Sequence, residues 1–268
     1  RDDWYLQGNG VVSSKRATLV PTDANLGVEG RPQSATGQAT ILTGRNVPQL
    51  IGEHYGPKPN AKVSEEIKQG TLFHEVVATG GSAALMTPYP QGYFDAVDSG
   101  KRLYSAVPLA VVSAGLPLFG EQELRQGQAV SPGFTGQGWR DFLDYDDMPV
   151  ISLHDAGKRI AAIAREYDLS FFEHWPSDRS GHRGPLEDAA AHLEMIDTVI
   201  GGILESWDDT SGLLIITSDH GNIEEKDHRR HTRNPVPTIL VGEQHSDLAL
   251  DIHDLADIAG VVRQKIEL

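Results

Sequence analysis

Residues 213–237 read LLIITSDHGNIEEKDHRRHTRNPVP, and we interpret the rest of the chain outward from this stretch. Its first five residues, Leu213–Thr217, are apolar or β-branched and predict a short strand that is buried on both faces. The strand ends abruptly at Ser218, Asp219 and His220, which a buried strand would not tolerate internally. Because ligands of open α/β sheets lie beyond the carboxyl ends of strands, we expect the chemistry of the protein at Asp219 and His220.

Further metal-binding side chains occur in two other segments. Asp178 and His182 follow an apolar run at 169–172, and His231 lies in the connection to a second apolar run at 238–241. The chain has no cysteine, which excludes disulfides and thiolate metal sites. Aspartate and histidine ligands without cysteine fit Zn²⁺ or Mn²⁺.

The composition excludes several classes of protein. A hydrophobic content of 39 % in 268 residues is typical of a globular chain. The net charge of −15 argues against nucleic-acid binding, which requires clustered Lys and Arg. No apolar run approaches the roughly 18 residues of a membrane span, and no signal peptide is visible. We therefore expect a cytoplasmic protein that uses divalent cations to bind an anionic substrate.

Predicted strands and helices alternate along the chain, which favours an α/β fold with a doubly wound, mostly parallel sheet covered by helices. Residues 1–115 and 151–268 are expected to form this core. Residues 116–150 are glycine-rich and irregular, and we predict a small inserted lid there. Strands are expected at 83–86, 169–172, 213–217 and 238–241, with short edge strands at 4–6 and 17–20; helices are expected in the second half of 30–44 and at 63–70, 71–78, 105–114, 155–167, 186–207 and 251–267.

A third group of candidate site residues lies in the loop that opens the helix of 30–44. Ser34 and Thr36 carry hydroxyl groups there, and a hydroxyl in this position is a candidate nucleophile. The amide groups at the start of the helix would face an anion. For Thr36, a structural role in capping or packing the helix is the alternative.

These motifs together resemble a known family. SDHGN at 218–222 with HTRNPVP at 231–237 resembles the C-terminal signature of cofactor-independent phosphoglycerate mutase, within the alkaline phosphatase superfamily. The DRSGH sequence at 178–182 is similar to the other metal segment of this family, and QSATGQ at 33–38 to its phosphorylated loop. The resemblance covers 30–44 and 169–242 and is greatest to the small metalloenzyme members, which lack the large cap of the mutases. Phosphopentomutase is a more distant relative.

The resemblance implies a site with two divalent cations, Mn²⁺ or Zn²⁺. It assigns Asp178, His182 and His231 to one cation, and Asp219, His220 and the Ser34 oxygen to the other. It also makes Ser34 the catalytic nucleophile. Thr36, Arg45 and Arg233 are candidates for binding the substrate.

The family has one more ligand, an Asp-Gly pair at the end of an N-terminal strand, and the chain shows no match to it. Asp23 follows the apolar residues 17–20, but Pro21 intervenes and no glycine follows. We expect a segment ahead of Arg1 to carry this strand, in preference to a substitution by Asp23.

The resemblance implies a metal-dependent phosphoester hydrolase or phosphotransferase that acts on a small phosphorylated substrate through phospho-Ser34. A mutase of the phosphosugar or phosphoglycerate type is the alternative, as is a non-catalytic metal-binding homologue if the N-terminal Asp is absent from the natural protein. A sulfatase is disfavoured because the Cys/Ser-x-Pro-x-Arg pattern is missing around Ser34. The sequence does not indicate an oligomeric state.

Overall fold

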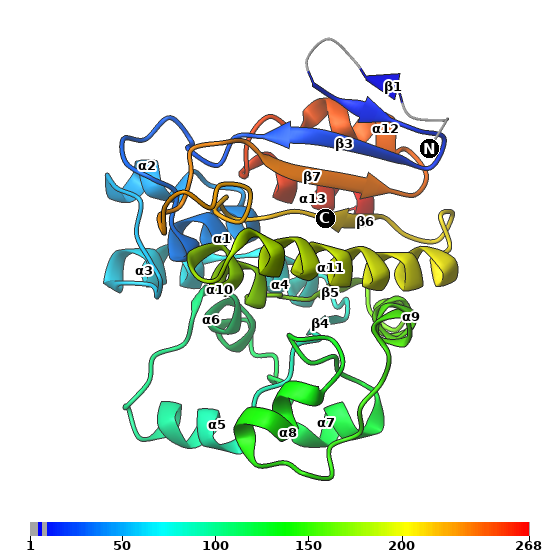
Figure 1. Ribbon diagram of the computed structural model, residues 1–268. Helices are drawn as coiled ribbons and strands as arrows, with labels where there is room; N and C mark the ends of the chain where they lie inside the picture. Colours follow the sequence, from blue (N-terminus) through cyan, green and yellow to red (C-terminus); the bar gives the residue numbers. More distant parts are fainter. Residues whose placement is uncertain (1–4, 7–9, 268) are drawn as a thin grey trace.

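The chain folds into two β-sheets with helices packed around them, and the computed structural model describes residues 5–6 and 10–267 (Figure 1). The strands are β1 (Tyr5–Leu6), β2 (Val12–Ser13), β3 (Ala17–Thr22), β4 (Ala83–Leu85), β5 (Leu169–Phe171), β6 (Leu214–Ile216) and β7 (Val236–Val241). The helices are α1 (Ser34–Thr43), α2 (Val47–Ile51), α3 (Ala61–Gln69), α4 (Leu72–Ala78), α5 (Gln91–Asp98), α6 (Ala106–Ser113), α7 (Glu121–Gln126), α8 (Gln137–Leu143), α9 (Leu153–Ala164), α10 (Pro176–His182), α11 (Leu186–Ser206), α12 (His245–Leu248) and α13 (Asp257–Ile266), with a 3₁₀ turn η1 (Ala249–Asp251). No helix in this described part combines the length and apolar character that a membrane span requires.

The mixed α/β class predicted from the sequence is confirmed, but the prediction of a mostly parallel sheet is wrong for the strands described. The larger sheet has the order β1-β2-β3-β7-β6, and all its strand pairs are antiparallel. Among the strands that the structure describes, β4 and β5 are the one parallel pair. Parallel neighbours require a crossover connection, usually a helix. The connection from β6 to β7 contains no helix and turns back directly, so β7 runs opposite to β6.

The two expected edge strands have different outcomes. Residues 17–20 belong to β3, which is an interior strand between β2 and β7. Leu6 lies in β1, at the edge of the sheet, while Trp4 lies outside the described residues.

Helices cover both faces of the larger sheet, and the alternation of side chains along β6 shows why. Leu214 packs against the cluster formed by α9 and α11, whereas Ile215 packs against the clusters that include α12 and α13. Successive side chains of a strand point to opposite faces, so both faces of β6 are apolar. Helices on both sides explain the continuous apolar run in the sequence, although the residues of β6 are half-buried and not fully buried as predicted.

Strands β5 and β6 are the outer strands of their two sheets in the described residues, since β5 pairs with β4 and β6 pairs with β7. Phe171 of β5 and Ile215 of β6 pack against the same apolar cluster, which contains Ile41, Val236 and other buried side chains. In Figure 1, β5 lies between β6 and β4. The two strands that precede the candidate site thus share one core.

Helices α9 and α11 come into close contact through two glycines. A Cβ atom on Gly157 would lie 2.0 Å from the Val199 carbonyl oxygen, and one on Gly202 would lie 2.1 Å from the His154 carbonyl oxygen. Only glycine permits this approach, which brings the two backbones into direct contact. The contact fixes α11 against α9.

Residues 116–150 are less irregular than the sequence suggested, because they contain α7 and α8. Leu124, Ala129, Trp139 and Met148 form a small apolar cluster of their own. In Figure 1 this segment and α5 lie at the end of the molecule opposite β3. Its assignment as a lid stays a prediction.

Candidate metal centre

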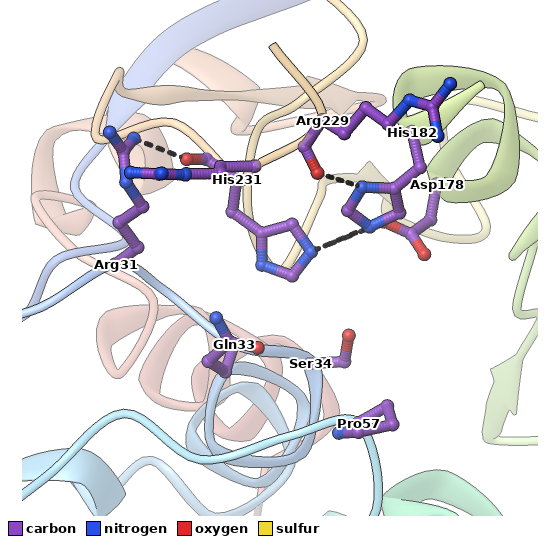
Figure 2. A pocket seen from close by; sticks show the side chains of 9 residues that line it. Arg31, Gln33, Ser34, Pro57, Asp178, His182, Arg229 and His231 are labelled. Carbon is purple, nitrogen blue, oxygen red and sulfur yellow. Dashed lines mark hydrogen bonds and ion pairs between the residues drawn. The ribbon is translucent and has the colours of Figure 1, made fainter. Parts of the chain in front are cut away.

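The candidate site gathers side chains from four segments at one end of the strands. Ser34 is the first residue of α1, Asp178 and His182 lie in α10 after β5, and His231 lies between β6 and β7. Asp219 and His220 follow β6 directly. Figure 2 shows Ser34, Asp178, His182 and His231 around one cavity.

Asp178 is the centre of the first predicted ligand set. One of its carboxylate oxygens, Oδ1, lies 3.2 Å from His182 Nε2 and 3.6 Å from His231 Nε2. The two histidine Nε2 atoms are 3.2 Å apart. His220 of the second predicted set lies beside them, since Asp178, His220 and His231 offer ligand atoms that all lie within 4.8 Å of one another. The two predicted sets therefore adjoin each other, and spacing of this kind suits the ligands of divalent cations.

Backbone carbonyl groups orient two of these histidines. His182 Nδ1 lies 2.7 Å from the Arg229 carbonyl oxygen (Figure 2). His231 Nδ1 lies 2.7 Å from the Pro32 carbonyl oxygen. A carbonyl only accepts, so each Nδ1 carries the proton and each Nε2 is the atom that remains to hold a cation. Metal-binding histidines commonly show this support. The donor set of Asp178, His182 and His231 therefore fits a divalent cation.

Burial and the neighbouring Asp178 shift the pKa of His231 in opposite directions. Burial of the ring opposes protonation, but the hydrogen bond with Asp178 raises the pKa above the usual value. A cation at Nε2 would compete with that proton, so metal affinity should weaken at acid pH.

Ser34 meets the second predicted ligand set. Its Oγ lies 2.9 Å from His220 Nε2, which in turn is 3.8 Å from Asp219 Oδ2. His220 is buried, and this burial lowers its pKa. Its Nδ1 has no hydrogen-bond partner among the described residues. The three side chains thus lie together, with Nε2 of His220 directed at the candidate nucleophile.

Two further residues of the 33–38 motif explain how α1 comes so close to Asp219. A Cβ atom on Gly37 would lie 2.7 Å from the Asp219 carbonyl oxygen, so only glycine fits between them. The Gln38 side-chain amide donates to Asp219 Oδ2 at 2.9 Å. Sequence reasoning did not select Gly37 or Gln38, although both stand in the same motif as Ser34.

Asn222 is another site residue that sequence reasoning missed. Its Nδ2 donates to Asp178 Oδ1 at 2.7 Å and to the Asp178 carbonyl oxygen at 3.2 Å. Gly181 lies against this amide, because a Cβ there would be 2.2 Å from Asn222 Oδ1. The loop after β6 is thereby joined to α10, and the orientation of Asp178 is fixed. The SDHGN motif, which ends in Asn222, was the available signal.

The loop between β6 and β7 folds back through polar contacts that return His231 to the site. The Thr232 N–H donates to the Gly221 carbonyl oxygen at 2.9 Å. Glu224 accepts hydrogen bonds from the Thr232 hydroxyl and, at 3.0 Å, from Asn234 Nδ2. Burial works against ionisation of Glu224, but these hydrogen bonds hold its pKa below the usual value.

The three predicted substrate-binding residues have other contacts. The buried Thr36 hydroxyl donates to the Gln33 carbonyl oxygen at 3.1 Å. Arg45 forms an ion pair with Glu66 at 3.1 Å, and Arg233 Nε donates to the Gly30 carbonyl oxygen at 2.6 Å. A role for any of them in substrate binding stays a prediction.

Asp23, the alternative to an N-terminal ligand, stabilises a local turn. Its Oδ1 accepts from the Asn25 N–H at 2.9 Å and its Oδ2 accepts from the Leu26 N–H at 3.1 Å. Its backbone N–H donates to the His253 carbonyl oxygen. The carboxylate is therefore used in this turn.

The cavity beside Ser34 has a volume of about 440 Å³. It is bounded by Arg31, Gln33, Ser34, Pro57, Asp178, His182, Arg229, Arg230 and His231. The three arginines give positive charge to this part of an acidic protein, which suits an anionic ligand. In Figure 2, Arg31 and Arg229 lie on opposite sides of the His231 ring, and Ser34 lies across the cavity from it.

Glu173 lies at the end of β5 and was not selected from the sequence. Burial raises the pKa of this carboxyl to about 7, and the negative charge of Asp219 acts in the same direction. Tyr89 donates a hydrogen bond to Glu173 Oε1 at 2.5 Å. The carboxyl thus lies within electrostatic range of the candidate site and titrates near neutrality.

Comparison with known proteins agrees with this geometry for the C-terminal part of the chain. Residues 146–268 match the model of the Metalloenzyme superfamily. This part of the chain is therefore similar to the Metalloenzyme superfamily. It includes Asp178, His182, Asp219, His220 and His231, whereas Ser34 lies outside the matched residues.

The chain is also similar to named enzymes. The 2,3-bisphosphoglycerate-independent phosphoglycerate mutase of Thiobacillus denitrificans is 35 % identical over 118 residues, which cover 41 % of this chain and 23 % of the mutase. The corresponding protein of Dinoroseobacter shibae is 36 % identical over 132 residues, covering 46 % and 26 % of the two chains. The match therefore spans about a quarter of the length of these relatives. The resemblance to the alkaline phosphatase superfamily and to this type of mutase is confirmed.

A solved structure of the PH0037 protein from Pyrococcus horikoshii is also similar. It matches 72 % of this chain and 51 % of its own, with 17 % identity and a TM-score of 0.47.

Proposed function

We propose that the chain is a metal-dependent phosphotransferase or phosphohydrolase in which Ser34 accepts a phosphoryl group. The observation that carries this proposal is the 2.9 Å contact between Ser34 Oγ and His220 Nε2, beside the Asp178, His182 and His231 group. A hydroxyl at the start of a helix, next to metal ligands and an arginine-lined cavity, is suited to phosphoryl transfer.

The described residues would hold two cations in the sets that the sequence indicated. Asp178, His182 and His231 would hold one, and Asp219, His220 and Ser34 would hold the other. When bound, divalent cations lower the pKa of a hydroxyl and neutralise the charge of a phosphoryl group. Mn²⁺ and Zn²⁺ both suit these oxygen and nitrogen donors.

The protein side chains position the reacting groups. Ser34 loses its proton to solvent, and its oxygen bonds to phosphorus while the bond to the leaving-group oxygen breaks with its electron pair. The Thr36 N–H donates to the Tyr55 carbonyl oxygen at 3.1 Å, so the amide groups of Ser34 and Ala35 at the start of α1 would face the transferred phosphoryl group; helix N-termini favour such anions. Arg31, Arg229 and Arg230 attract the substrate to the cavity. Phospho-Ser34 is then cleaved by water or by a second hydroxyl.

Hydrolysis is our first choice for this second step. A mutase must exclude water while it holds the phosphorylated intermediate. Among the described residues, no side chain of 116–150 lines the cavity beside Ser34, which supports access of water. The similarity to phosphoglycerate mutases favours transfer as the second candidate, and a non-catalytic metal-binding role is the third.

Mass spectrometry of quenched reactions tests the nucleophile. Wild-type protein is incubated with a panel of phosphoesters and either Mn²⁺ or Zn²⁺, and a phosphoryl adduct is expected on the peptide that contains Ser34. Ser34→Ala should abolish turnover, while Ser64→Ala on α3 should retain it. Turnover by Ser34→Ala, or an adduct on Thr36, would contradict the assignment.

Isotopic labelling of the solvent distinguishes the first two candidates. In H₂¹⁸O, hydrolysis places ¹⁸O in the released phosphate, whereas transfer to a second hydroxyl leaves the phosphoryl group unlabelled. A protein that binds the cations and turns over no phosphoester would support the non-catalytic role.

A further inference from the structure

A second pair of histidines lies outside the candidate metal centre. His174 follows β5, and His192 lies on α11; their Nε2 atoms are 2.8 Å apart. Neither residue belongs to the ligand sets derived above. The geometry of this pair closely resembles that of His182 and His231, which suggests that both pairs can bind a metal cation.

The ring of His174 is fixed on two sides. Its plane stacks on Phe134, with ring centroids 4.4 Å apart and an angle of 11° between the planes. Its Nδ1 lies 2.7 Å from the Pro132 carbonyl oxygen. Because the carbonyl can only accept, Nδ1 carries the proton of the neutral ring, and Nε2 presents a lone pair toward His192.

The two histidine pairs share several measurements. The rings of His174 and His192 have centroids 5.0 Å apart and planes at 31°; those of His182 and His231 have centroids 5.0 Å apart and planes at 33°. In both pairs Nε2 faces Nε2, and a carbonyl 2.7 Å from Nδ1 orients a ring. Burial lowers the pKa of His174 to about 4 and also lowers that of His192, so both rings are neutral at neutral pH.

We propose that His174 and His192 form a separate binding site for one late first-row transition-metal cation, such as Zn²⁺, Ni²⁺ or Cu²⁺. Imidazole nitrogen suits these cations, whereas the hard Mg²⁺ and Ca²⁺ prefer oxygen. The two rings supply two ligands, and water completes the coordination from the partly exposed side. The site takes no residue from the candidate metal centre and does not depend on the proposed reaction.

Cation binding requires a change of tautomer at His192 and a small separation of the two Nε2 atoms. Without a cation, His192 Nε2–H donates to His174 Nε2. To bind one, His192 transfers its proton from Nε2 to Nδ1, so its charge does not change. Each nitrogen takes a position about 2.0–2.1 Å from the cation, and the Nε2 atoms separate to roughly 3 Å, as in the other pair.

A calorimetric titration of the protein with Ni²⁺ as the only added metal tests the site. His192→Gln should bind one Ni²⁺ fewer than the wild type, or bind it at least tenfold more weakly. His253→Gln is the matched control, because His253 is exposed on another segment, and it should keep the wild-type stoichiometry. Equal Ni²⁺ binding by wild type and His192→Gln would overturn the proposal and leave the pair as a hydrogen bond.

Diffraction from wild-type crystals soaked in Ni²⁺ gives a test that needs no variant. An anomalous peak within bonding distance of both Nε2 atoms of His174 and His192 is expected, separate from any peak at Asp178. Peaks at Asp178 with none at the pair would also overturn the proposal.

Discussion

Ser34 Oγ lies 2.9 Å from His220 Nε2, although 186 positions separate the two residues in the sequence. The contact joins the start of α1 to the loop after β6 and depends on several supporting residues around it. Gly37 and Gln38 fix α1 against Asp219, and Asn222 fixes the same loop against Asp178. The first two predictions address this support.

Asn222→Ala should weaken metal binding without removing a ligand. The variant loses the 2.7 Å hydrogen bond to Asp178 Oδ1, so the carboxylate becomes free to rotate. Loss of such a supporting partner typically costs about 10–100-fold in metal affinity. Asn60→Ala is the control, because the Asn60 side chain accepts from the Val63 N–H at 2.9 Å at the start of α3 and belongs to neither predicted ligand set. Calorimetric titration with Mn²⁺ measures both, and equal affinities would remove Asn222 from the support of the site.

Gly37→Ala should reduce turnover of a phosphoester substrate while the protein still folds. The new Cβ would lie 2.7 Å from the Asp219 carbonyl oxygen, so α1 must move away and take Ser34 with it. A displacement of about 1 Å at a reacting group can cost roughly 10²-fold in rate.

Gly92→Ala on α5 is the matched control for this change, because nothing lies within 4 Å of a Cβ at that position. It should leave kcat/KM at the wild-type value. If Gly37→Ala also retained full activity, the close approach of α1 to Asp219 would not be needed for turnover.

Gly201 and Gly202 are adjacent on α11, but replacing each by alanine should change the free energy of unfolding in opposite directions. A Cβ on Gly202 would lie 2.1 Å from the His154 carbonyl oxygen, so Gly202→Ala forces α9 and α11 apart at a cost of roughly 2–3 kcal/mol. Nothing lies within 4 Å of a Cβ on Gly201, and Gly201→Ala should stabilise the helix by up to about 1 kcal/mol. Urea denaturation measures both free energies of unfolding; similar values for the two variants would be inconsistent with the helix contact.

Glu173 should make the stability of the protein depend on pH. Its pKa is about 7 in the folded protein, above the usual 4.5, so the folded state binds the proton more tightly than the unfolded state. Stability from this group is present below the unfolded pKa and is lost as pH rises through 7. Because the side chain keeps some access to solvent, the loss should be about 2 kcal/mol, below the full equivalent of the shift.

Glu173→Gln cannot ionise and should remove this part of the pH dependence. Between pH 5 and pH 8, the unfolding free energy of the variant should therefore increase relative to that of the wild type. Urea denaturation at each pH measures both values. Asp197→Asn, at an exposed position of α11, serves as the control. Parallel pH profiles for wild type and Glu173→Gln would show that folding does not raise the pKa of Glu173.

The sequence predicted the parts of the fold that depend on strong local patterns. The apolar run before Ser218 identified β6, and Gly44 ended α1 through a left-handed conformation with φ of 68°. Short helices such as α2 and α10 were missed, because their few residues carry proline or polar side chains and their apolar spacing is weak. The direction of the strands was also missed, since the antiparallel turn from β6 to β7 depends on long-range contacts of its loop.

The candidate site was predicted through residue types that bind cations, and the structure brings Ser34, Asp178, His182, His220 and His231 together. Supporting residues were harder to identify. Asn222 and Gly37 bind no cation themselves, and their importance appears only when the loops meet. The assignment of individual cations to these residues stays a prediction.

The sides of β5 and β6 that face away from their partners β4 and β7 lower the local stability of these two strands. Neither edge has a strand partner in the described part of the chain, and each strand contributes only three residues to its sheet. Backbone groups at such edges open to water at a lower free energy than those of an interior strand. Both strands lead directly into ligand-bearing loops, so a cation that joins the loops would also hold the strand ends closed. Amide hydrogen exchange at Leu214–Ile216 should therefore slow when Mn²⁺ or Zn²⁺ binds, making these amides reporters of metal occupancy.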